Sequence, residues 1–304
     1  MKFDFKGLLK NKKNEKKKPQ TSTEKFIAWV KTIIWAIVVV MIINGLALAS
    51  FVVPTGSMEN TVMTGDFLFV NKFIYGPTTP QVIPFFNIPL PFYKFPAPKD
   101  PAKGDVIVFI FPGYRDEVKS NEFQYYLKRC VATVGDTIQI INNILYINGK
   151  RSPIPPNAII DSSNYEDPSD KFRTFPPGLG FTRNNYGPLV VPKKGDVIHL
   201  NQDNYRQWAT FISREGHNVD NTGTAITIDG KVVTDYTVER NYCFGMGDNR
   251  DHSLDSRYWG FIPYNNVVGT PMIVYWSWDT NLSMSHFFDK LSSIRFNRIA
   301  KIIR

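Results

Sequence analysis

The sequence predicts a mostly β protein that is attached to a membrane by a single N-terminal helix. An uncharged run of 21 residues, IIWAIVVVMIINGLALASFVV, extends from Ile33 to Val53. After Pro54, short β-branched and aromatic runs alternate with turns rich in Gly, Pro, Asn and Asp, and few segments before residue 280 have helical spacing. We therefore expect an antiparallel, barrel-like β body followed by a short C-terminal amphipathic helix.

The net charge of +9 lies at the two ends of the chain. Residues 1–25 contain nine lysines and three acidic residues, and residues 289–304 contain five basic residues and one acidic residue. A nucleic-acid-binding protein usually carries its basic patch on the folded domain. The distribution here favours an anionic membrane surface. Membrane lipid is therefore an expected partner, and nucleic acid is not.

Residues 26–53 are predicted to form the transmembrane helix. At 1.5 Å per residue, the uncharged run spans about 30 Å, the thickness of the hydrocarbon core of a bilayer. The basic segment 1–25 precedes it, so the positive-inside rule places 1–25 in the cytoplasm and residues from 54 onward outside. A cleaved signal peptide is the alternative, because Ala47-Leu48-Ala49 has the form of a cleavage site. The apolar part of such a peptide is usually only about 7–15 residues long, which favours a retained anchor.

The predicted β-rich domain covers residues 54–280. Within it, residues 126–150 give a strand, a turn at Gly135-Asp136, a strand, a turn at Asn142-Asn143 and a strand. Two insertions interrupt the pattern, at about 77–101 and 151–190.

Insertion 77–101 is too dense in proline for a central strand. A loop that dips into the lipid interface and a loop packed on the body both remain open. Insertion 151–190 is rich in Pro, Ser, Asn and Asp and is predicted to be exposed. Residues 281–304 form a basic amphipathic segment that is too short to cross a membrane. Its attachment to the membrane surface and its docking on the body are both left open.

Candidate chemistry begins at Gly56-Ser57, where a turn could expose a hydroxyl beside free backbone N–H groups, as a nucleophile with an oxyanion hole requires. His252 is one candidate base, because it lies in the polar run GMGDNRDHSLDSRYWG (245–260) and could act with Ser57 and an aspartate. Lys128, within FQYYLKRCVATV, is the other. With a usual pKa of about 10.4, a lysine is neutral at pH 7 only about once in 2,500, so a lysine base requires burial.

Cys130 and Cys243 are too few for a disulfide framework or a cysteine-rich zinc site. A single bridge between them is left open. The sequence predicts no metal site and no cofactor.

Four segments in order, PTGSMENTVMTGDFLFVNKFIYG (54–76), KGDVIVF (103–109), YLKRCVATVGD (126–136) and GMGDNRDHSLDSRYWGFIP (245–263), resemble bacterial type I signal peptidases. The last segment is the most specific of the four. The resemblance implies a Ser/Lys dyad serine endopeptidase on the outer face of the plasma membrane that removes signal peptides from exported preproteins. Insertions 77–101 and 151–190 lie outside the resemblance.

The resemblance also implies roles for individual residues. Ser57 would be the nucleophile, Lys128 the general base, and Ser253 a hydroxyl that orients the lysine amine. Asp255 and Arg257 would form a supporting pair.

The backbone N–H of Ser57 and the hydroxyl of Thr55 would form the oxyanion hole, and Met58 would border the substrate. Thr55 stands where Ser is common in the family. Asn60 stands where Pro is usual.

A non-catalytic, membrane-anchored binding module for exported chains is the alternative function. It would share the anchor and the β body but would not need Ser57, Lys128, Ser253 and Asp255 together. Their joint presence favours the enzyme. A self-cleaving Ser/Lys regulator is disfavoured, because a membrane anchor rather than a DNA-binding module precedes the body. The oligomeric state is not predicted.

Overall fold

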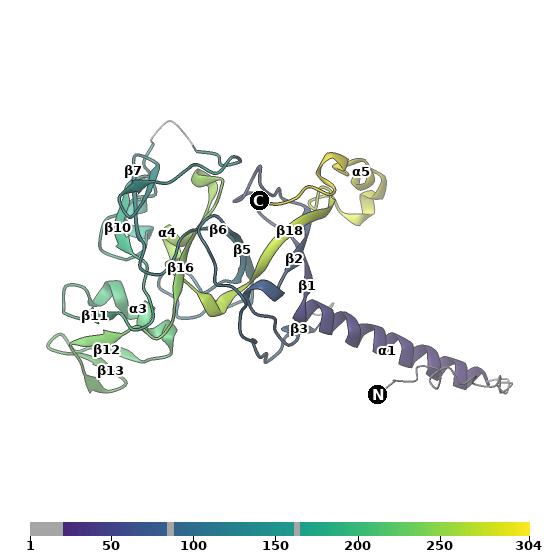
Figure 1. Ribbon diagram of the computed structural model, residues 1–304, viewed down its shortest axis with the longest axis horizontal. Helices are drawn as coiled ribbons and strands as arrows, with labels where there is room; N and C mark the ends of the chain where they lie inside the picture. Colours follow the sequence, from purple (N-terminus) through teal and green to yellow (C-terminus); the bar gives the residue numbers. More distant parts are fainter. Residues whose placement is uncertain (1–20, 84–87, 161–164) are drawn as a thin grey trace, which may run out of the picture. The chain divides into compact units, whose positions relative to one another are not determined.

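The computed structural model describes residues 21–304 apart from 84–87 and 161–164. The described chain consists of a long N-terminal helix, α1 (Ser22–Leu46), and a β-rich body (Figure 1). Contacts divide the protein into a first unit that ends at Met41 and a second, Ile42–Arg304, that contains the body.

Helix α1 begins with a capping box. Glu24 N–H donates to Thr21 Oγ1 at 3.3 Å, and Thr21 N–H donates back to Glu24 Oε2 at 2.9 Å. Its most apolar window has a mean hydropathy of 2.5, and within the described residues it is the one helix long and apolar enough to cross a membrane.

The helix ends at Leu46, so the prediction that it continues to Val53 is wrong. Residues Leu48–Val52 form strand β1 instead and pair with β2 (Asp66–Asn71). Gly45 lies so close to a neighbouring loop that an added Cβ would stand 2.6 Å from Thr78 O. The run looked continuous in the sequence because an apolar strand and an apolar helix have the same composition.

The central sheet of the described chain has seven strands in the order β1-β2-β18-β5-β6-β16-β17, and every neighbouring pair is antiparallel. Register shifts interrupt the pairing of β18 with β2 and with β5, and such bulges increase bending and twist. The sheet curls into a half-barrel, so Phe51 of β1 meets Tyr125 of β6 with ring centroids 4.9 Å apart. The remaining strands are β5 (Val106–Ile110), β6 (Tyr125–Ala132), β16 (Tyr242–Met246), β17 (Ile262–Pro263) and β18 (Val267–Ser277).

Smaller sheets flank the half-barrel, in the orders β10-β7-β8-β9, β11-β15, β12-β13-β14 and β3-β4. The predicted turn at Asn142-Asn143 joins β7 to β8, with φ of 48° and 67°. Both angles suit a tight hairpin turn. The strands are β3 (Val82–Ile83), β4 (Ile88–Pro89), β7 (Thr137–Ile141), β8 (Ile144–Ile147), β9 (Lys150–Arg151), β10 (Tyr186–Val190), β11 (Val197–His199), β12 (Val219–Asn221), β13 (Ile226–Ile228), β14 (Lys231–Val232) and β15 (Asp235–Thr237).

Short helices complete the body: α2 (Asp170–Arg173), α3 (Tyr205–Glu215), α4 (Ser256–Trp259) and α5 (Phe287–Ser292). The sequence pattern gave no indication of α3, which buries Phe211 and Ile212 against the core beneath the smaller sheets.

The prediction that insertion 151–190 is exposed is wrong for its second half. Phe175, Tyr186 and Leu189 are buried in the core, and β10 extends the sheet at β7. The polar composition concealed these residues because they are spaced singly among Pro, Asn and Gly.

Insertion 77–101 is tied to the body by Lys94, whose Nζ donates to the backbone carbonyls of Tyr264, Asn265 and Val267 at 2.5–3.2 Å. Its aromatic residues Phe92, Tyr93 and Phe95 remain exposed. Gln81 is buried as well, and its Oε1 accepts from Lys72 Nζ at 3.0 Å and from Tyr125 OH at 2.8 Å. The insertion therefore packs on the body while it presents aromatic surface.

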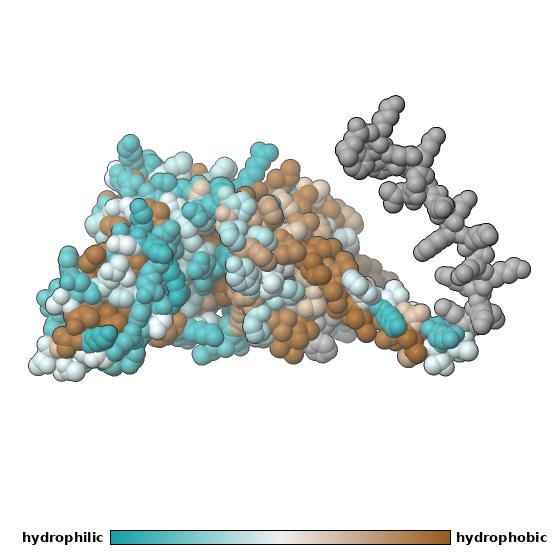
Figure 2. All heavy atoms as spheres, turned by 60° about the horizontal axis from the view of Figure 1, so that its bottom comes forward, coloured by the Kyte–Doolittle hydropathy of each residue, from teal (hydrophilic) through white to brown (hydrophobic). Residues whose placement is uncertain are grey.

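The C-terminal segment contains the predicted short helix, α5, which ends at Ser292, and a single 3-10 turn follows at Phe296–Arg298. The chain then docks on the body. Arg298 pairs with Asp66 of β2, and Val274 of β18 exchanges backbone hydrogen bonds with Ala300 and Lys301 at 2.8 and 2.9 Å. Figure 2 shows hydrophobic side chains gathered at the end of the body that carries β1, β2 and β18.

We expect Arg298→Met to lower the free energy of unfolding by ~3–5 kcal/mol, because removing one partner of a buried ion pair leaves the other charge uncompensated. Arg298 and Asp66 are both buried, with Nε–Oδ1 and Nε–Oδ2 distances of 2.8 and 3.0 Å. Urea denaturation followed by tryptophan fluorescence measures the loss. The double variant Asp66→Asn/Arg298→Met should recover part of it. An unchanged midpoint for Arg298→Met would contradict the assignment.

Candidate active site

The curl of the central sheet brings Ser57 and Lys128 together. Ser57 lies in the turn that follows β1, and Lys128 lies on β6. Lys128 Nζ is 2.7 Å from Ser57 Oγ and 3.1 Å from the backbone oxygen of Leu127. The hydroxyl and the amine are therefore close enough for direct proton transfer.

Lys128 is 4% exposed. Gly245 faces it across the β6–β16 pair, where an added Cβ would stand 3.1 Å from Lys128 Cβ, and the ring of Tyr126 lies 5.7 Å from its amine. Burial lowers the pKa of Lys128 to about 8, and the nearby charge of Asp255 opposes part of that decrease. At pH 7 about one amine in ten is then neutral, against about one in 2,500 for an exposed lysine.

Asp255 and Arg257 form the buried pair that the resemblance implied. Arg257 Nε donates to Asp255 Oδ1 and Arg257 Nη2 to Asp255 Oδ2, both at 2.9 Å. Burial alone would raise the pKa of Asp255, but the Arg257 guanidinium and the Gly247 N–H hold it below its usual range. Arg257 Nη2 also donates to Arg250 O at 2.6 Å, so the pair fixes the loop that follows β16.

A second buried pair, which the sequence reasoning missed, joins β6 to the same loop. Arg129 Nε and Nη2 donate to the two carboxylate oxygens of Asp248 at 2.8 and 2.7 Å, and Thr61 Oγ1 donates to Asp248 at 2.5 Å. The signal was the position of Arg129 directly after Lys128 and of Asp248 within the Gly-Asp-Asn-Arg run. Neighbouring residues on a strand point to opposite faces. Lys128 therefore contacts Ser57 from one face of the sheet, and Arg129 pairs with Asp248 from the other.

Of the remaining predicted residues, Ser253 and Met58 are buried, whereas Thr55 and His252 are exposed. Ser253 is buried beside Gly247, but among the described residues its Oγ has no hydrogen-bond partner, so the expected bond to Lys128 is not made. Met58 is buried, and its Sδ accepts from Asp248 N–H at 3.3 Å. Thr55 is exposed. His252 is also exposed, and in the described part of the chain no hydrogen bond joins it to Ser57, which disfavours the Ser–His–Asp alternative.

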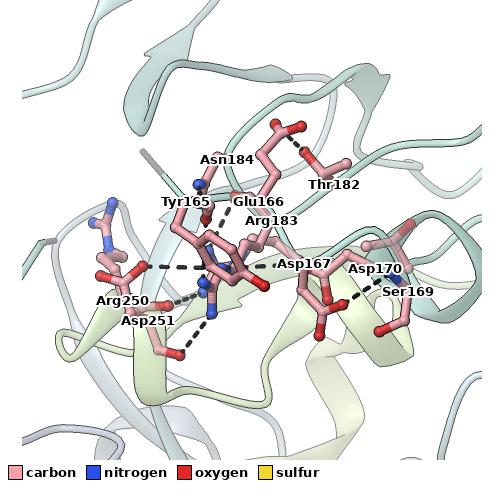
Figure 3. A network of polar contacts seen from close by, with 12 residues as sticks. Tyr165, Glu166, Asp167, Ser169, Asp170, Thr182, Arg183, Asn184, Arg250 and Asp251 are labelled. Atoms are coloured by element: carbon pink, nitrogen blue, oxygen red, sulfur yellow. Dashed lines mark hydrogen bonds and ion pairs between the residues drawn. The ribbon is translucent and has the colours of Figure 1, made fainter. Parts of the chain in front are cut away.

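A polar network holds insertion 151–190 against the loop that follows β16 (Figure 3). Arg183 donates to the backbone oxygens of Asp251 and Tyr165, both at 3.3 Å, and Asn184 Nδ2 also donates to Tyr165 O at 2.9 Å. Arg183 Nε lies 3.9 Å from the carboxylates of both Asp170 and Asp251. The insertion therefore supports the loop that carries Arg250 and Ser253.

The two cysteines are both buried and both free, so they form no disulfide. Within the described ranges, no group of three or more His, Cys, Asp or Glu side chains is arranged to hold a metal ion.

A serine hydroxyl hydrogen-bonded to a buried lysine amine is the arrangement expected of serine hydrolases that use lysine as a base. The family model of signal peptidase, peptidase S26, matches residues 26–276. The chain belongs to this family of serine peptidases.

Relatives of known name agree with the family assignment. Signal peptidase I of Helicobacter pylori strain J99 is 33% identical over 264 residues, which cover 82% of this chain and 81% of the relative. Signal peptidase I of Rickettsia bellii is 28% identical over 279 residues, which cover 88% of this chain and 83% of the relative. A crystal structure of a signal peptidase I from Enterococcus faecalis V583 aligns at 21% identity over 57% of this chain and 97% of its own, with a TM-score of 0.28.

We expect kcat/KM to rise with pH and to reach half its maximum near pH 8. Only the neutral amine of Lys128 accepts a proton, and burial lowers its pKa to about 8, so activity is lost as the pH falls below that value. Initial rates on a fluorogenic preprotein peptide between pH 6 and 11 give the profile, with enzyme preincubated at each pH and returned to pH 8 as the control for stability. A midpoint near 10.4 would contradict a buried base.

Proposed function

We propose that this protein is a membrane-bound endopeptidase that removes N-terminal signal peptides from exported preproteins through a Ser57/Lys128 dyad. The observation that supports it most directly is the 2.7 Å contact between Ser57 Oγ and the buried amine of Lys128. A binding module would have no use for a lysine held against a serine in an apolar environment, and burying its charge would destabilise the fold.

Acylation begins when the neutral Lys128 amine takes the proton of Ser57 as Oγ attacks the scissile carbonyl carbon. The negative oxygen of the tetrahedral intermediate accepts hydrogen bonds from Ser57 N–H and from the Thr55 hydroxyl. The intermediate collapses as the C–N bond breaks, and the Lys128 ammonium donates its proton to the leaving amine. The mature protein departs, the signal peptide stays on Ser57 as an ester, and Lys128 is neutral again.

Deacylation repeats these steps with water. Lys128 takes a proton from the water, the resulting hydroxide attacks the ester carbonyl, and the proton returns to Ser57 Oγ as the C–O bond breaks. One amine thus serves as base and then as acid in each half of the reaction, which suits a pKa of about 8 near physiological pH.

The supporting residues hold the reacting groups in position. Asp255 and Arg257 hold the loop that carries Ser253, and a rotation of the unbonded Ser253 hydroxyl would let it orient the Lys128 amine. We assign Met58, buried directly after the nucleophile, to the border of the substrate site. We assign the second oxyanion donor to the hydroxyl of Thr55, which is exposed two residues before Ser57.

We place the protein in the plasma membrane as a single-pass protein with a cytoplasmic N-terminus and the catalytic body on the outer face. The basic residues that precede α1 support this orientation through the positive-inside rule. Its proposed partners are preproteins that emerge from the same bilayer, and the lipid of that membrane.

Ser57→Ala and Lys128→Ala should each abolish processing of a preprotein, with rates at least about 10³-fold below wild type, because both members of the dyad are needed for each proton transfer. His252→Ala should stay within about twofold of wild type. A gel assay of purified variants on one preprotein measures all three. Normal cleavage by Lys128→Ala together with loss in His252→Ala would replace the dyad with a histidine mechanism.

Protease added to intact spheroplasts should digest the body and leave only a fragment that contains residues 1–46, because the proposed orientation exposes everything beyond α1. An antibody to an N-terminal epitope detects the fragment, and a cytoplasmic protein that stays intact is the control for lysis. Digestion confined to residues 1–25 would reverse the orientation.

A further inference from the structure

Asn249 makes two hydrogen bonds to the residues that form the nucleophile turn. Its backbone N–H donates to Ser57 O, and its side-chain Nδ2 donates to Gly56 O, both at 3.1 Å. Asn249 is 7% exposed and lies in the loop that follows β16, far along the chain from the turn that carries Ser57.

The bond to Gly56 O fixes more than one atom. Gly56 C=O and Ser57 N–H belong to the same planar trans peptide and point in opposite directions. A donor that holds the carbonyl on one side therefore aims the Ser57 N–H to the other. Withdrawing electron density through the carbonyl also polarises that N–H, which makes it a stronger donor to a developing negative charge.

The backbone N–H of Ser57 is available to donate a hydrogen bond to a substrate. Within residues 21–304, the two gaps aside, it donates to no protein acceptor, whereas Gly56 O accepts from both Glu59 N–H at 3.0 Å and Asn249 Nδ2. The turn thus satisfies its carbonyls and leaves one N–H directed away from them, as an oxyanion hole requires.

Asn249 is itself held firmly. Ile159 N–H donates to Asp248 O at 2.8 Å, and Arg250 N–H donates to Ile159 O at 2.9 Å, so the backbone on each side of Asn249 is paired. In the described part of the chain, its Oδ1 has no partner. The one side-chain bond of Asn249 is therefore the bond to Gly56 O.

We propose that Asn249 is a positioning residue for the oxyanion hole, which acts by orienting and polarising the Gly56–Ser57 peptide so that Ser57 N–H meets the tetrahedral intermediate. The inference rests on the proposed function, because it assigns the oxyanion to Ser57 N–H. In this assignment Asn249 acts through the Gly56–Ser57 peptide and takes no part in the proton transfer by Lys128.

The test replaces Asn249 in the purified full-length protein with Ala and, separately, with Leu, which removes the donor at similar volume. Cleavage of a fluorogenic preprotein peptide should show kcat lowered at least about tenfold, less than the 10²–10³ typical of losing a donor itself. KM should stay within about twofold, since the ground-state carbonyl gains little from this N–H. The pH midpoint of kcat/KM should not move, because Lys128 is untouched.

Asn266 offers matched controls. Its Nδ2 also donates to a backbone carbonyl, Ile110 O, at 3.0 Å, away from the dyad. Asn266→Ala and Asn266→Leu should keep wild-type kcat, and thermal unfolding midpoints report folding for all four variants.

The inference is overturned if both Asn249 variants keep kcat within about twofold, if KM rises at constant kcat, or if the pH midpoint shifts with the loss. Unfolding of both Asn249 variants beside stable Asn266 variants would assign a purely structural role and would also overturn it. Ser57→Ala, assayed in parallel, distinguishes a failure of the proposed function from a failure of the role proposed for Asn249. Normal cleavage by Ser57→Ala refutes the proposed function, whereas an inactive Ser57→Ala beside fully active Asn249 variants refutes only the role of Asn249.

Discussion

The structure depends on keeping one lysine amine out of water without an acidic partner. Among the described residues Lys128 forms no ion pair, whereas its neighbour Arg129 is paired with Asp248, and Arg257 with Asp255. Both pairs are buried, as Lys128 is, so the guanidinium groups of Arg129 and Arg257 each have a carboxylate partner, whereas the Lys128 amine has none at hydrogen-bond distance. A carboxylate at hydrogen-bond distance would stabilise the ammonium and raise its pKa, and the amine would no longer serve as a base.

The curl of the sheet gives the amine its partner. β1 and β6 are separated by β2, β18 and β5 in the sheet order, yet Phe51 and Tyr125 are in contact across the gap. The bulged pairing of β18 bends the sheet enough for the two strands to approach. The loop after β16 then fills the space behind Ser57, where Gly247 has no room for a Cβ because Ser57 O would lie 2.5 Å from it.

The sequence was sufficient to predict the apolar N-terminal helix and the β body, because these depend on local composition. The contact of Ser57 with Lys128 and the Asp255–Arg257 pair were predicted through the family resemblance, which specific runs of residues carry. It could not locate the end of α1, since only the pairing of Leu48–Val52 with β2 distinguishes strand from helix there. The burial of Phe175 and Tyr186, the pairing of Arg129 with Asp248 and the two bonds of Asn249 depend on contacts between distant segments, which no periodicity encodes.

Asn60, where the family usually has proline, has a backbone φ of 68°. The ring of proline fixes φ near −65°, so proline cannot occupy this turn as it is built here. Asn60 O also accepts from Lys301 Nζ at 2.8 Å, which links the turn to the docked C-terminal segment. A proline at this position would therefore require a different backbone conformation of the turn after the nucleophile, and the carbonyl that Lys301 contacts in that turn would move with it.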